Sequence, residues 1–88
     1  MSIIFFKEFS EGVFETHSQR PEYLIHTIEQ THSSDIIEYQ GSPTKEQKAD
    51  GIIIDPKTYP NHAIAIKTAD CLPILLLGEK IAMIHAGW

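Results

Sequence analysis

The amino-acid sequence predicts an α/β fold of the α+β kind, built on a mixed sheet that ends in a C-terminal antiparallel hairpin. Three observations lead to this prediction. Four apolar runs in the second half of the chain, separated by turn residues, are typical of buried strands that are apolar on both faces. The last two runs flank Gly78-Glu79, a pair typical of a tight turn. One stretch of the first half has apolar residues at helical spacing instead.

The first third of the chain predicts two short extended segments and a helix. Ile3 to Phe6 has the composition of an opening strand, Ser10-Glu11-Gly12 that of a turn, and Val13-Phe14 that of a second extended piece. Ser18 can cap a short amphipathic helix over Pro21 to Gln30, where apolar residues recur at spacings of three and four.

The remainder predicts turns and strands. Thr31 to Asp35 is a polar turn that places His32 where a loop meets the strand-like segment Ile36 to Tyr39, and Gly41 to Lys48 is typical of an exposed loop. The four apolar runs are Ile52 to Ile54, Ala63 to Ile66, Leu72 to Leu77 and Ile81 to Ile84. No internal repeat or linker interrupts the chain, so we expect residues 1–88 to form a single partial domain.

Composition narrows the classes of function. Hydrophobic residues make up 42% and charged residues 22%, as in ordinary folded proteins. The net charge is -5 without any basic run, so we expect no nucleic-acid partner. The apolar run Leu72 to Leu77 is far shorter than the ~20 residues that cross a bilayer. Cys71 is the single cysteine and the N-terminus does not resemble a signal peptide, so we expect a cytoplasmic protein.

The chain ends at Ala86-Gly87-Trp88, directly after a predicted strand and without a segment to cover that strand. We therefore expect a piece of a larger fold, which could self-associate through an open sheet edge.

The predicted hairpin brings Cys71 and His85 together at its open end. In a ladder centred between Gly78 and Glu79 the paired residue numbers sum to 157, and a shift to 156 places Cys71 opposite His85. Opposed side chains lie about 4.5–5.5 Å apart at Cβ, close enough to share a metal ion or a proton. Asp70 lies beside them and needs a donor such as an imidazole N–H if it is buried.

These residues leave three kinds of site open. Asp70, Cys71 and His85 fit a zinc site, a copper site or a cysteine-nucleophile site, in which His85 activates Cys71 as in cysteine hydrolases. The residues to which we assign no role from spacing are His17, His26, His62, Lys67 and the turn-like pair Asp50-Gly51.

Four strings carry a resemblance to a known family: Gln30-Thr31-His32, Ala49-Asp50-Gly51, Thr68-Ala69-Asp70-Cys71-Leu72-Pro73 and His85-Ala86-Gly87-Trp88. Together they resemble the YfiH-like family, also called the polyphenol oxidase or laccase-domain family. The resemblance implies a fold likened to the catalytic domain of cytotoxic necrotizing factor, and zinc bound by His32, Cys71 and His85.

The resemblance implies purine nucleoside phosphorylase activity, with adenosine deaminase and methylthioadenosine phosphorylase as companion activities, so that a purine nucleoside and phosphate are the expected small-molecule partners. Such proteins were first described as copper polyphenol oxidases, and some bacterial relatives as peptidoglycan editing factors. The alternatives are a copper polyphenol oxidase, a cysteine hydrolase and an inactive metal-binding remnant.

Two parts of the family pattern have no match here. A Thr-Arg-Gly-Gly-like and a Ser-Leu-Asn-Leu-like segment are not found in Lys7 to Gln30, and the Arg-Gly expected after Trp88 lies beyond the end of the sequence. We therefore expect the 88-residue chain to bind zinc but to phosphorolyse nucleosides far more slowly than a full-length relative.

Overall fold

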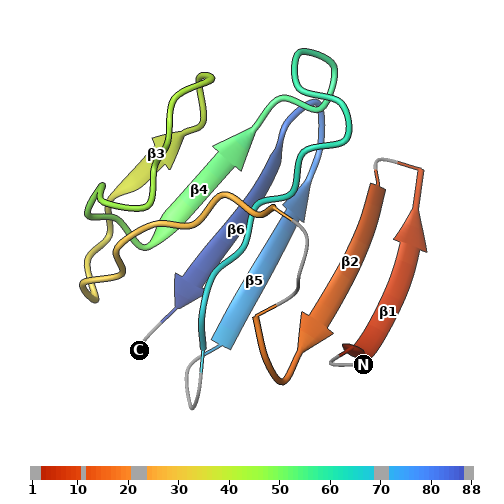
Figure 1. Ribbon diagram of the computed structural model, residues 1–88, viewed down its shortest axis with the longest axis horizontal. Coiled ribbons are helices and arrows are strands. Elements are labelled where there is room, and N and C mark those ends of the chain that lie inside the picture. The colour runs from red at the N-terminus through yellow and green to blue at the C-terminus, as the bar shows by residue number, and fades with distance from the viewer. Residues whose placement is uncertain (1–2, 11, 21–23, 69–71, 87–88) are drawn as a thin grey trace.

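The computed structural model describes residues 3–10, 12–20, 24–68 and 72–86. These residues form six strands, β1 (Ile3–Phe9), β2 (Gly12–His17), β3 (Ile36–Glu38), β4 (Gly51–Ile54), β5 (Leu72–Leu77) and β6 (Ile81–Ala86) (Figure 1). Within these ranges the chain has no helix, and consequently none long and apolar enough to cross a membrane.

The strands form two sheets. β1 and β2 make an antiparallel pair, and the other four strands make a sheet of order β3-β4-β6-β5. In this second sheet β3 runs parallel to β4, whereas β6 is antiparallel to both of its neighbours. The predicted mixed sheet and its C-terminal antiparallel hairpin are thus confirmed, as is the strand character predicted for Ile3 to Phe6 and Ile52 to Ile54.

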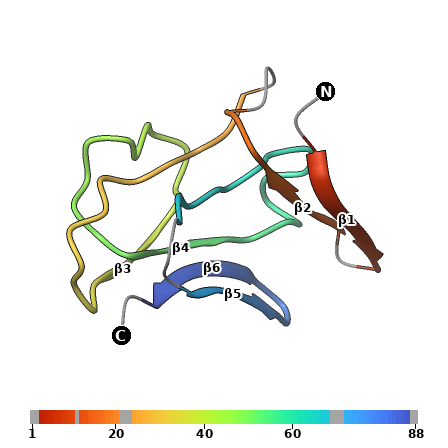
Figure 2. The same cartoon turned by 90° about the horizontal axis from the view of Figure 1, so that it is seen from below.

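The core lies on one face of the four-stranded sheet. Ile37, Ile52 and Met83 stand in one row across β3, β4 and β6, because the register pairs Ile37 with Ile52 and Ile52 with Met83. Extended segments cross above the sheet (Figure 2) and complete the cluster with Ile28, Ala49, Ile64 and Ile66. Ile52 at its centre is fully buried.

The helix predicted over Pro21 to Gln30 is wrong for its described part. Residues 24–30 are extended, and their backbone pairs with two distant segments. His26 N–H donates to the carbonyl of Ala63 and Glu29 N–H to that of Gln47, at 2.8 and 2.9 Å. Such partners satisfy the backbone without a helix, and β-branched residues such as Ile28 favour the extended form.

Two predicted strands differ from the expectation of burial on both faces. Ala63 to Ile66 forms only an isolated bridge, at Ile64, and acts as a half-buried cover of the core. β5 is an edge strand that exposes Leu72, Leu76 and Leu77. A run of apolar residues thus does not distinguish a central strand from an edge strand.

The hairpin register also differs from the prediction. Pro73 pairs with His85 and Leu77 with Ile81, so the paired numbers sum to 158 and not to 157 or 156. The connection contains three residues, Gly78 to Lys80, and the Lys80 ammonium binds Glu38 of β3 at 2.9 Å. Consequently the cross-strand partner of His85 is Pro73, in place of the Cys71 predicted there, and Cys71 itself lies outside the described residues.

Replacing the central core residue tests this packing. Ile52→Ala should lower the free energy of unfolding by about 2–5 kcal/mol, because it removes buried methyl groups and leaves a cavity. The matched control Leu24→Ala, at a side chain that is 77% exposed, should change it by less than about 0.5 kcal/mol. Urea unfolding followed by circular dichroism measures both, and equal effects of the two substitutions would contradict the core assignment.

Candidate metal centre

Two of the predicted metal ligands lie side by side. His85 belongs to β6 and is buried, whereas His32 is exposed in the turn that precedes β3. The centroids of the two rings are 5.4 Å apart and the rings meet edge to face, at 63°. The fold therefore brings together imidazoles from distant parts of the sequence, as two ligands of one metal ion would require.

Asp50 fixes the ring of His85. The β4–β6 register pairs Gly51 with Ile84, so Asp50 and His85 are the next opposed residues. The His85 backbone N–H donates to the Asp50 carbonyl at 2.7 Å, and His85 Nδ1 lies 2.8 Å from Asp50 Oδ2. A backbone bond and a side-chain bond between the same two residues leave the imidazole little freedom to rotate.

The other carboxylate oxygen of Asp50 holds the turn that carries His32. Oδ1 accepts the backbone N–H groups of Thr31 at 3.0 Å and Ser33 at 2.8 Å, together with the Ser33 hydroxyl at 3.1 Å. Between these two N–H groups His32 has a φ of 59°, in the left-handed region. This conformation costs of order 1–3 kcal/mol for a residue other than glycine and persists where surrounding contacts enforce it.

The surroundings keep Asp50 ionised. Burial, at 2% exposure, would by itself raise its pKa. Hydrogen bonds from His85, Ser33 and Thr31 outweigh burial and hold the pKa of this carboxyl far below its ordinary value. An ionised carboxylate only accepts hydrogen bonds, so Nδ1 of His85 carries the hydrogen of this bond, and Nε2 is the nitrogen that has the lone pair when the ring is neutral.

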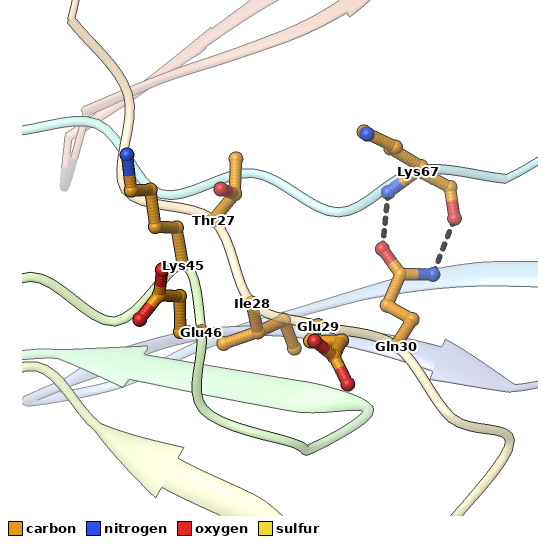
Figure 3. Close-up of a pocket in the computed structure, with 7 residues that line it drawn as sticks. All are labelled: Thr27, Ile28, Glu29, Gln30, Lys45, Glu46 and Lys67. Atoms are coloured by element: carbon orange, nitrogen blue, oxygen red, sulfur yellow. Dashed lines mark hydrogen bonds between the residues drawn. The ribbon is translucent and has the colours of Figure 1, made fainter.

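Asp70 and Cys71, the other predicted site residues, lie outside the described residues. Within the described ranges no three His, Cys, Asp or Glu side chains converge on one metal position. The segment that leads towards Cys71 is nevertheless fixed at Lys67. The Gln30 side chain donates to the Lys67 carbonyl and accepts the Lys67 N–H, both at 2.6 Å (Figure 3). Lys67, to which we assigned no role, thus contributes through its backbone.

A pocket of about 490 Å³ opens beside this link. It is lined by Thr27, Ile28, Glu29, Gln30, Lys45, Glu46 and Lys67 (Figure 3). Its two lysines are balanced by two glutamates, so the pocket does not present the concentrated positive charge that a phosphate group requires. We assign it no ligand.

A second histidine pair packs elsewhere. His26 Nε2 and His62 Nδ1 share a hydrogen bond of 2.8 Å, and His26 stacks on the buried Tyr39 with ring centroids 4.0 Å apart. Tyr59 packs against both Tyr39 and His62. Since each of the two facing nitrogens already has the other as its partner, this cluster joins segments of the fold and is a structural contact. Burial, and secondarily the neighbouring His62, lower the pKa of His26.

Asp50 is the site residue that sequence reasoning missed. Its pair with Gly51 has the composition of an ordinary turn, and the carboxylate expected to hold an imidazole was Asp70 instead. The available signal was position, since Asp50 directly precedes an apolar strand just as Cys71 does. A charged residue at the start of a buried strand needs a partner there.

Comparison with known proteins gives one family. The model for multi-copper polyphenol oxidoreductase laccase matches residues 10–88. Proteins named purine nucleoside phosphorylase YfiH, from Shigella flexneri and from Escherichia coli, are 36% identical over 64 residues, which cover 69% of this chain and 25% of each relative. A purine nucleoside phosphorylase from Bacteroides thetaiotaomicron is 33% identical over 85 residues, 86% of this chain and 31% of the relative. The chain spans about a quarter to a third of these relatives.

The lowered pKa of His26 gives a dependence of stability on pH. Because the folded-state pKa of His26 is below the ordinary value of 6.5, the contribution of its neutral ring to the free energy of unfolding is fully present above pH 6.5. This contribution is lost as the pH falls through the folded-state pKa. The urea midpoint should therefore decrease from pH 7.5 to pH 5, and His26→Gln should reduce this difference. A variant with the same pH difference as the parent chain would contradict the assignment to His26.

Proposed function

This chain belongs to the multi-copper polyphenol oxidoreductase laccase family, whose model matches residues 10–88, and on that premise we propose that it is part of a zinc-dependent purine nucleoside phosphorylase. The observation that carries the proposal is the pair His32 and His85 held by Asp50, at positions where the family resemblance puts two zinc ligands. Relatives named purine nucleoside phosphorylase support the reaction class. Adenosine deamination and methylthioadenosine phosphorolysis are proposed as companion activities.

Two of the described residues have the donor groups that zinc binds. His85 presents Nε2 because Nδ1 is bound to Asp50, and the His32 ring lies beside it. Cys71, at the third ligand position by resemblance, would supply a thiolate. Three protein ligands leave one position open, and zinc bound there would lower the pKa of a coordinated water to about 7. A thiolate ligand must stay reduced, in keeping with the cytosolic location that we propose.

The residues of this chain act by holding these groups in place. Asp50 keeps the hydrogen on Nδ1 of His85 and fixes the turn around His32, so that both imidazoles are oriented before a substrate arrives. Correct orientation of reactants is worth about 7–11 kcal/mol of a barrier. Inosine or adenosine, with phosphate, are the proposed substrates. Because the chain spans about a quarter of the YfiH relatives, we propose that groups beyond these residues position phosphate and nucleoside.

A copper polyphenol oxidase is the second candidate, since the description of the family names that chemistry. A laccase uses several copper centres with imidazole and thiolate ligands. This chain has five histidines and one cysteine, and His26 and His62 bind one another. Within residues 1–88 the remaining donors suffice for one metal centre, so we place a single zinc first for this segment.

Metal content tests the ligand set. The purified chain should contain one zinc, and Cys71→Ala should remove it, because two imidazoles alone bind zinc weakly. His17→Ala is the matched control and should keep the metal. Elemental analysis after dialysis gives the stoichiometry, and a Cys71→Ala chain that retains one zinc would show the three-ligand assignment to be wrong.

Activity is tested in a chimera that supplies the rest of the protein. This chain replaces the matching segment of the Escherichia coli relative, and release of hypoxanthine from inosine is measured with and without phosphate. We expect phosphate-dependent release that Cys71→Ala abolishes, and far slower release by the 88-residue chain alone. Release of hypoxanthine that depends on neither phosphate nor Cys71 would contradict the proposal. Oxidation of phenols by the copper-loaded chimera in place of hypoxanthine release would contradict it as well.

A further inference from the structure

We propose that Asp50 is the residue that positions both His32 and His85 for zinc. One of its carboxylate oxygens fixes the turn that carries His32, and the other fixes the tautomer of His85. This inference rests on the proposed function, because the metal is the one proposed above.

Each oxygen of Asp50 has a separate task. Oδ1 accepts hydrogen bonds from the Ser33 hydroxyl and from the N–H groups of Thr31 and Ser33, which flank His32 on both sides. N–H groups of neighbouring residues that converge on one oxygen form an anion-binding nest, which suits a carboxylate better than a neutral group. Oδ2 meets Nδ1 of His85 at 2.8 Å. No other described side chain joins the two histidines in this way.

The hydrogen bond to Oδ2 decides which nitrogen of His85 can bind a metal. A carboxylate has no hydrogen to give, so Nδ1 must donate and Nε2 is left with its lone pair. The backbone bond from His85 N–H to the Asp50 carbonyl keeps the two residues in register. Because His85 and Asp50 are buried, water cannot readily replace the carboxylate as the partner of Nδ1.

The substitution Asp50→Asn separates positioning from packing. The amide has the shape of the carboxylate, and its oxygen can still accept the N–H groups of Thr31 and Ser33. Its nitrogen then faces His85 and donates, so Nδ1 must become the acceptor and the hydrogen moves to Nε2. The variant should keep the fold and bind zinc about 10–100-fold more weakly, as for outer-shell partners of metal ligands.

The experiment has a readout that does not need activity. The ¹⁵N chemical shifts of the His85 ring, measured in the metal-free chain, tell which nitrogen carries the hydrogen. We expect Nδ1–H in the parent chain and Nε2–H in Asp50→Asn. Zinc affinity is measured by competition with a chromophoric chelator. Asp35→Asn, the same charge change at an exposed side chain, is the matched control and should leave both quantities within about twofold.

Two outcomes would overturn the proposal. Nε2–H in the metal-free parent chain would overturn it, and this reading holds even if Asp50→Asn fails to fold. A folded Asp50→Asn chain with parental zinc affinity would overturn it as well. Ser33→Ala removes the hydroxyl bond to Oδ1 and the bond that this hydroxyl accepts from the Asp35 N–H, and it should weaken zinc binding without moving the hydrogen of His85. Failure of the parent chain to bind zinc would instead refute the proposed function, while the tautomer would still report on the Asp50–His85 contact.

Discussion

A buried ionised carboxylate is the constraint on which this structure depends. Asp50 is 2% exposed, and a charge at that depth is tolerated only when hydrogen bonds replace water. It obtains them from both sides of the site, from the turn 31–33 and from His85. The Asp50–His85 contact requires the observed β4–β6 register, and the contact with Thr31 and Ser33 requires the turn before β3 to fold back. Sheet register and site geometry are therefore fixed by the same side chain.

The sequence allowed prediction of the features that depend on local pattern. The apolar runs predicted β4, β5 and β6, and Gly78-Glu79 predicted the antiparallel hairpin. The hairpin register could not be predicted because connections of two and three residues differ by one in the pairing sum, and both suit this composition. Strings of family resemblance gave His32 and His85, whose rings the fold brings within 5.4 Å.

What could not be predicted depends on partners far away in the sequence. The spacing of Leu24 and Ile28 fits a helix, yet Leu24 is 77% exposed and Ile28 is buried in the core. Backbone pairing with Ala63 and Gln47 stabilises the extended form, and local propensity does not include such pairing. The role of Asp50 was missed for the same reason, since its partners are 17 to 35 residues distant and its neighbours resemble an ordinary turn.

The contacts that hold His85 and His32 also depend on where the strands end. His85 lies within β6, whose backbone is hydrogen-bonded to β4 and β5, so only its ring needs the further support of Asp50. His32 lies in a turn, which has no ladder of its own, and Asp50 supplies the missing hydrogen bonds through its side chain. Lys67 likewise lies outside the sheet, and Gln30 supplies the equivalent of a strand partner through its amide. The side chains of Asp50 and Gln30 thus stand in for strand partners, and they fix the turn around His32 and the backbone of Lys67, neither of which lies in a strand.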